Sequence, residues 1–214
     1  MIDRLVKKTE IILSLTAEAY LQHKYQIPFP EPSQTQKSIG EPFEAHTVIL
    51  PNGLFLINAR GFGFINVEKG SQEIVRSIPL VFGYKGKLYP NLDLVFLCDY
   101  YGVDPKDIKV VFGKYIEFKP NRHYFGTKRI PIDEHGNFLI NFRQGESFLA
   151  QGTALHQLFH YAKYKDKYKS GIKPEEFKDA FIIFGENNIG GTDTQPLPLQ
   201  PGFPMIGVHA NVID

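Results

Sequence analysis

The chain has 214 residues, 43% of them hydrophobic, and its 18 Phe and 11 Tyr can supply the core of one large domain or two small ones. A formal net charge of +1 gives no global electrostatic signal for binding nucleic acid or an anionic membrane. The single cysteine, Cys98, excludes an internal disulfide, and the apolar run LDLVFLCDY around it predicts a small buried side chain.

The first sixty residues alternate apolar runs with breaks. The end of a helix is expected over residues 2–8 and a buried strand over residues 10–15. A cluster of prolines makes residues 26–42 a long loop. A short strand over residues 47–50 and a short helix over residues 54–60 complete this part of the chain.

The middle of the chain is dominated by short strands around one helix. Strands are predicted over residues 64–67, 74–82, 108–112, 115–118, 129–132 and 138–142. The segment Glu134-His135-Gly136-Asn137 predicts a hairpin turn, with glycine where positive φ is needed. The helix is expected over residues 91–101, with Gly102 as its C-terminal cap. Its shared face would hold Leu92, Val95, Phe96 and Tyr100.

The last sixty residues return to alternating helix and strand. The longest helix is expected over residues 153–169, capped by Thr153. A continuous apolar run over residues 181–184 predicts a buried strand, and HANVID is expected to open a final helix. The fold class is therefore α/β (α+β): a mixed β-sheet with flanking helices and an antiparallel-rich middle section.

A polar loop, GENNIGGTD, follows the predicted final strand directly. It lacks the G-K-[ST] ending of a phosphate loop and the spacing of the dinucleotide motif. Its compact polar groups are ligand-binding candidates, and they are Asn187, Asn188, Thr192 and Asp193. Gly190 and Gly191 would let backbone N–H groups point inward. The alternative is a purely structural turn that Asp193 holds by accepting backbone hydrogen bonds.

Two histidines, His156 and His160, stand four residues apart in the predicted helix segment HQLFH. This spacing can place both imidazoles on one face for a metal, but Gln157 stands where a zinc protease needs glutamate. No third ligand is evident, so a structural pair is favoured and no metal or other cofactor is expected. Arg76 lies in an otherwise apolar strand, where it is either exposed at an edge or paired with a carboxylate.

No stretch approaches the roughly 18–20 apolar residues of a membrane span. The charged start MIDRLVKKTE also lacks the apolar region of a secretory signal. Composition alone would therefore place the chain outside any membrane.

Three blocks of sequence resemble one known family, the second type of the cyclase/histidine-kinase-associated sensory extracellular (CHASE) domain. GFGFINVEKGSQEIVRSIPLVFGYKGKLYPNLDLVFL resembles its G-F-x-N-V, R-x-x-P-L and Y-P-S-L-A pattern. IPIDEHGNFLINFRQGESF resembles its I-P-L-D-x-x-G-x-L-L-I-N-Y-R-G pattern. In the third block, the matching positions are Gly185, Gly190, Asp193, Pro196, Pro198, Gly207, Val208, His209, Ala210 and Asn211.

The resemblance implies that residues 1–214 form a single extracytoplasmic sensor domain, periplasmic or extracellular, of a bacterial transmembrane receptor. A longer parent would supply an N-terminal strand and helix, the membrane spans, and a cyclase or kinase output domain. The expected partners are an unknown small-molecule ligand, the receptor's own transmembrane helices and output domain, and a second copy in a homodimer. No nucleic acid partner and no catalytic activity are expected of this domain.

The same resemblance suggests roles for particular residues. Arg76 and Asn66 would support the loop from Asn187 to Asp193 in binding the ligand. His209 and Asn211 would either couple binding to the membrane or simply start the final helix. Two alternatives stay open from the residues themselves. One is a small metal-dependent hydrolase that uses His156 and His160, and the other is a dimerisation module without a small ligand.

Overall fold

A computed structural model describes residues 40–46, 48, 61, 63–67, 74–143, 153–164, 177–178, 180–186, 193–198 and 200–214. The chain divides into two compact units, one ending at Ile140 and one starting at Asn141. The elements expected over residues 2–8, 10–15 and 54–60 lie outside the described residues, as do nearly all of residues 26–42 and 47–50.

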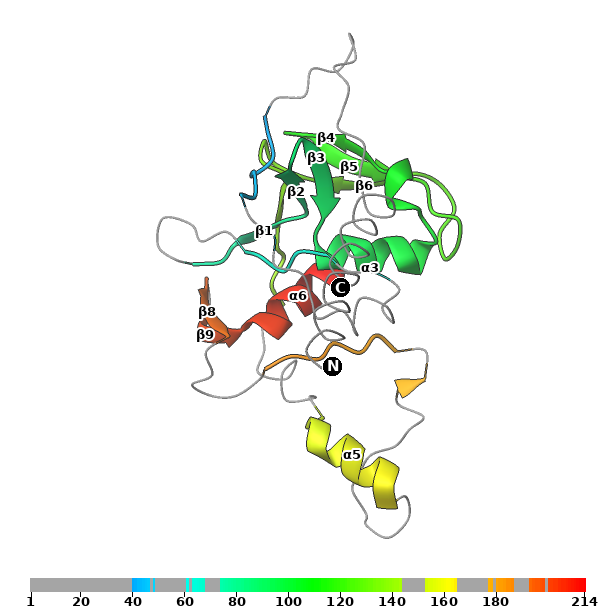
Figure 1. Cartoon of the computed structure of the whole chain (residues 1–214), viewed down its shortest axis with the longest axis vertical. Helices are drawn as coiled ribbons and strands as arrows, with labels where there is room; N and C mark the ends of the chain where they lie inside the picture. The colour runs from blue at the N-terminus through cyan, green and yellow to red at the C-terminus, as the bar shows by residue number, and fades with distance from the viewer. Residues whose placement is uncertain are drawn as a thin grey trace, which may run out of the picture. The chain divides into compact units, whose positions relative to one another are not determined.

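The first unit is built from small antiparallel sheets (Figure 1). In the three-stranded sheet, β5 (Tyr115–Phe118) lies between β4 (Lys109–Val111) and β6 (Lys128–Pro131). β2 (Val81–Tyr84) and β3 (Lys87–Pro90) form a hairpin. β1 (Ser77–Pro79) pairs with β7 (Asn137–Leu139), which returns from much later in the chain.

The core of this unit follows from strand periodicity. In β5, Ile116 and Phe118 are buried while Tyr115 and Glu117 are half-buried on the opposite face. Neighbouring strands, loops and the central helix supply the other fully buried apolar side chains, which include Val75, Ile78, Leu80, Val81, Leu88, Leu94, Val110 and Phe112. The strand predictions over residues 108–112, 115–118 and 129–132 are therefore confirmed to within a residue or two.

The central helix α3 (Leu92–Tyr101) confirms the expected helix and its C-terminal cap, and it begins one residue later than expected, after Asn91. The Asn91 side chain accepts a hydrogen bond from the Leu94 amide (2.8 Å), and Gly102 ends the helix in the left-handed conformation. The predicted apolar face is wrong in part: Val95 is buried, but Leu92 is exposed and Phe96 and Tyr100 are only half-buried. The helix also buries Leu94 and Cys98, which lie on the same side as Val95 at spacings of one and three residues. A short 3-10 turn, η1 (Pro105–Asp107), leads from α3 to β4.

Two predictions in the middle section need correction. Of the expected strand over residues 64–67, only Phe64 forms a bridge, a parallel one to Asn91. The turn around Gly136 (φ +87°) is present, and Asp133 Oδ1 accepts hydrogen bonds from the amides of His135 and Asn137. It is not a hairpin, however, because β6 pairs with β5 and β7 pairs with β1. The turn therefore passes the chain from one sheet to another.

The described part of the second unit contains two helices and one hairpin. The helices are α5 (Leu155–Tyr164) and α6 (Met205–Ile213), and the hairpin joins β8 (Thr194–Leu197) to β9 (Gln200–Pro204). Together with the first unit they confirm the α+β class. α5 agrees with the helix expected from residue 153, whose last five residues lie outside the described part.

The C-terminal segment departs furthest from expectation. Residues 181–184 form no strand, and Phe181, Ile182 and Phe184 are exposed, so the predicted buried strand is wrong. The described strands pair among themselves in small antiparallel sheets, and none of the described pairings includes this run. The final helix also begins four residues before His209, so HANVID lies in the second half of α6 rather than at its start.

Candidate functional site

The first turn of α6 contacts the residue at which the predicted ligand loop ends. The Met205 amide donates a hydrogen bond to the Asp193 carbonyl (3.0 Å). This position follows from the hairpin register, since Thr194 in β8 lies opposite Pro204 in β9 and the next residues outward are Asp193 and Met205. Pro204 offers no side-chain cap, so the Asp193 carbonyl satisfies an amide that a helix start leaves without a partner.

The residue before the loop contacts the same turn. A Cβ placed on Gly185 would lie 2.9 Å from the Ile206 Cβ, so glycine allows the backbone to approach the helix here. Gly185 and Asp193 thus bracket residues 187–192 and touch neighbouring positions of α6.

The far end of α6 is held by Asn211, whose side chain is only 8% exposed. Its Oδ1 accepts a hydrogen bond from the Arg143 amide (2.9 Å), and its Nδ2 donates one to the Gly207 carbonyl one turn earlier (2.7 Å). The side-chain amide thus acts both as acceptor and as donor, and it connects the last turn of the helix to the segment around Arg143 at the start of this unit. Asn211 thereby joins two stretches of chain separated by 68 positions.

An ion pair lies beside this contact. Arg143 Nη2 is 2.5 Å from Asp214 Oδ2, but both side chains are largely exposed. Exposed pairs typically contribute less than about 1 kcal/mol because water screens them. The buried amide of Asn211 is therefore the stronger of the two ties. His209 lies half-buried on the same helix.

The ligand-binding candidates are only partly visible. Asn187, Asn188 and Thr192 lie outside the described residues, and Asp193 is exposed at the start of β8. In the first unit, Arg76 is exposed just before β1, and its carbonyl accepts a hydrogen bond from the Ile140 amide that extends the β1–β7 pairing. Asn66 is exposed in the segment after the Phe64 bridge.

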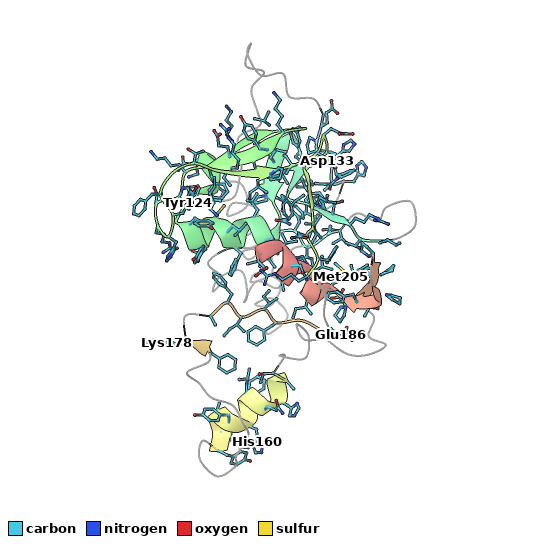
Figure 2. The ribbon with its side chains drawn as sticks, turned by 180° about the vertical axis from the view of Figure 1, so that it is seen from behind. Tyr124, Asp133, His160, Lys178, Glu186 and Met205 are labelled. Atoms are coloured by element: carbon cyan, nitrogen blue, oxygen red, sulfur yellow. The ribbon has the colours of Figure 1, made fainter. Side chains whose placement is uncertain are left out.

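The histidine pair lies on α5, where both His156 and His160 are exposed. The His160 ring packs on Tyr164 with a centroid separation of 4.7 Å, and Figure 2 marks its place on the helix. Within the described residues, no cluster of three or more His, Cys, Asp or Glu side chains could hold a metal ion. The described helices likewise include none long and apolar enough to cross a bilayer.

Sequence motifs do not mark two features of the structure. Arg143 lies in the resembling block around INFRQG, but its contribution to Asn211 is made by its backbone amide, which no motif can single out. The loop between β5 and β6 contacts α3 through residues about twenty positions apart in the sequence, which is beyond the reach of a local motif. Its signal in the sequence is the dense basic and aromatic string KPNRHYFGTK.

Comparisons with curated proteins and with solved structures returned no match. Comparison with protein families did return one: the chain matches the CHASE2 domain over residues 9–214, which includes every residue of the α6 site. CHASE2 domains are extracytoplasmic sensory domains, typically without catalytic activity, and belong to membrane receptors. Because the match extends over nearly the whole chain, this protein belongs to the CHASE2 domain family.

Proposed function

We propose that the chain is the ligand-sensing input domain of a bacterial transmembrane receptor, in which residues 187–193 contact the ligand and α6 transmits its binding. The family assignment supports the receptor context. Beyond that context, we propose residues 187–193 as the ligand site and α6 as the element that transmits binding. Arg76 and Asn66 are proposed as further ligand contacts, and no metal or other cofactor is required.

One observation carries this proposal: both residues that bracket the loop touch the first turn of α6. The Asp193 carbonyl accepts from the Met205 amide, and Gly185 lies against Ile206. A loop closing around a ligand cannot move these residues without moving the helix or breaking the contacts. The two residues that bracket the loop are therefore in direct contact with the helix, which supports coupling between ligand binding and α6.

The mechanism is a shift between two packings of α6. A ligand that binds one packing more tightly than the other moves the population toward it, and only this difference in affinity can carry a signal. Asn211 and His209 lie in the second half of the helix, and Asn211 is tied to Arg143. We assign both residues to coupling, since they lie on the part of the helix that leads away from the loop.

The remaining partners follow from the receptor context. The domain would act on the receptor's own transmembrane helices, and through them on a cytoplasmic cyclase or kinase. A second copy of the domain in a homodimer would place two α6 helices under the control of two loops. A dimerisation module without a small ligand is the competing possibility, and the experiment below separates the two.

The experiment begins with a thermal-shift screen of the native chain against amino acids, small carboxylic acids and sugars. A compound that raises the melting temperature is then tested on the combined variant Asn187→Ala, Asn188→Ala and Asp193→Ala. The Asp193 carbonyl remains in this variant, so the anchor on Met205 is retained. Asp107→Ala, which removes an exposed carboxylate in the first unit, is the matched control.

The proposal expects the combined variant to lose the thermal shift and the control to keep it. Hydrogen exchange of the α6 amides should change when the compound binds the native chain. In Asn211→Ala, the compound should still bind but should change α6 exchange less. If the combined variant binds the compound as tightly as the native chain does, residues 187–193 are not part of the ligand site. If the chain dimerises and no compound raises its melting temperature, a dimerisation module without a small ligand is favoured.

A further inference from the structure

The loop between β5 and β6, residues 119–127, displays two aromatic side chains to solvent. Phe125 is 100% exposed, which makes it the most exposed large apolar side chain in the described part of the chain. Its neighbour Tyr124 is also exposed, and Figure 2 shows it on the loop at the rim of the first unit. Exposed apolar groups of this size cost solubility, and their display on a structured loop points to a binding role.

The loop is firmly anchored where it passes the end of α3. Asn121 Nδ2 donates to the Gly102 carbonyl (2.7 Å), and the Asn121 amide donates to the Tyr101 carbonyl (2.9 Å). Arg122 Nε donates to the Tyr100 carbonyl (2.8 Å), and its guanidinium also contacts the Asp99 carbonyl and carboxylate. The Asp99 carbonyl also accepts a hydrogen bond from the Gly102 amide (3.3 Å). The carbonyls in the last turn of a helix seek donors from outside it, and a cation is favoured at this end of the helix dipole.

Ring contacts fix the next part of the loop. His123, in the left-handed region at φ +64°, stacks on the Tyr100 ring with centroids 4.4 Å apart and planes 6° apart. Lys128 Nζ lies over two rings, Tyr101 at 4.7 Å and Tyr124 at 5.0 Å. His123 and Lys128 thus restrain the chain before and after the loop tip, and Lys128 also contacts the Tyr124 ring, so less backbone freedom is lost when the tip binds.

Charge decides which partner fits this loop. Between residues 119 and 131 the sequence has four cations, Lys119, Arg122, Lys128 and Arg129, and no acidic residue. Asp99 and Glu117 offset part of this charge through their contacts to Arg122 and Arg129. Lys119 and Lys128 then leave the loop locally basic, although the whole chain carries only +1. The partner is therefore anionic, and it accepts an aromatic pair at its surface.

A lipid surface meets both conditions better than a protein does. A stable protein partner needs about 800 Å² of complementary surface on each side, whereas the apolar part of this loop is two adjacent residues at a tip. A bilayer needs no shaped pocket. Tyrosine and phenylalanine enter its interface, while lysine and arginine attract its headgroups. The membrane-receptor context of the family means that a bilayer lies close to the domain.

We propose that the β5–β6 loop is a membrane contact, which inserts Phe125 and Tyr124 into the surface of an anionic phospholipid bilayer. This contact is separate from the ligand loop at residues 187–193 and needs no ligand. It gives the domain a second point of attachment beside the receptor's own membrane spans. A failure to bind vesicles would therefore refute the membrane contact without touching the proposed ligand site. A failure of ligand binding at residues 187–193 would likewise leave the membrane contact standing.

The absence of tryptophan from the chain makes a direct test available. Phe125→Trp places a single fluorescent reporter in the loop, and Leu139→Trp places one on β7, where the native side chain is 73% exposed. Each variant is mixed with vesicles of phosphatidylglycerol and phosphatidylcholine in equal parts, or of phosphatidylcholine alone. The proposal expects a blue shift, and quenching by brominated lipid, for the reporter at 125 on anionic vesicles only. An unshifted reporter at 125, or equal quenching at 139, would overturn it.

Sedimentation with the same vesicles measures the contribution of each group. Phe125→Ser should weaken binding about tenfold, since an apolar ring no longer enters the interface. Lys119→Gln should weaken it about fivefold, and added salt should abolish the difference. Lys114→Gln, at the opposite end of β5, is the matched charge control. A control that weakens binding as much as Lys119→Gln, or a photo-crosslinker at 125 that couples to protein rather than lipid, would refute a lipid contact.

Discussion

Replacing Asn211 with alanine should loosen the end of α6 by an amount that the contacts allow us to work out. The Arg143 amide is partly buried, and leaving it without an acceptor costs about 1.5 kcal/mol. The lost bond to the Gly207 carbonyl costs about 0.5 kcal/mol more, because that carbonyl lies inside the helix. The higher helix propensity of alanine offsets about 0.6 kcal/mol of this. The net cost is about 1.4 kcal/mol, a tenfold change in the opening equilibrium.

Hydrogen exchange on the α6 amides measures this opening directly, because it reports local unfolding of the helix itself. Amides near the end of the helix should exchange about tenfold faster in Asn211→Ala. Asn211→Asp keeps an acceptor for the Arg143 amide and should have a smaller effect. Arg143→Ala removes only the exposed ion pair with Asp214 and should change exchange less than about threefold. If Asn211→Ala accelerates exchange no more than Arg143→Ala does, the buried amide is not the stronger tie.

The remaining predictions concern the first unit. Gly136→Ala should lower the free energy of unfolding by about 2–4 kcal/mol, because its Cβ would lie 2.8 Å from Val81 Cγ2 at a φ of +87°. Gly86→Ala, at φ +70° in open space, should cost only about 1 kcal/mol in a denaturant titration, and equal costs would contradict close packing at Gly136. Burial raises the pKa of Cys98 from 9.0 to about 12, so the unfolded thiol ionises before the folded one and stability falls as pH rises above about 9. Denaturation between about pH 8 and pH 11 should show a steeper loss for the native chain than for Cys98→Ala, and parallel curves would indicate an accessible thiol.

Local patterns predicted the middle of the chain well. The strand expected over residues 115–118 is observed as β5 (Tyr115–Phe118), and the helix expected over residues 91–101 is observed as α3 (Leu92–Tyr101), which ends before its predicted cap Gly102. These elements succeed because the information is local. Alternation fixes which side of β5 is buried, and a capping side chain acts on amides within three residues of itself.

Patterns failed where an element depends on a distant partner. The apolar run over residues 181–184 has the composition of a buried strand, but an apolar run cannot itself specify what pairs with it. The hairpin β8–β9 was missed for the opposite reason, since its four prolines argue against a strand by themselves. The turn at Gly136 was found, but the partners of β6 and β7 were assigned wrongly, because pairing depends on the whole sheet.

For the candidate site, the sequence by itself determined the family and the residues that carry its motifs, including Asp193, His209 and Asn211. Only the tertiary structure decided what these residues contact. It brought the Asp193 carbonyl to the start of α6, gave Asn211 the Arg143 amide as a partner, and anchored the β5–β6 loop on the last turn of α3. Each of these contacts uses at least one backbone amide or carbonyl; every residue carries the carbonyl, and every residue except proline carries the N–H. The sequence therefore cannot mark them, and only the path of the chain selects which ones meet.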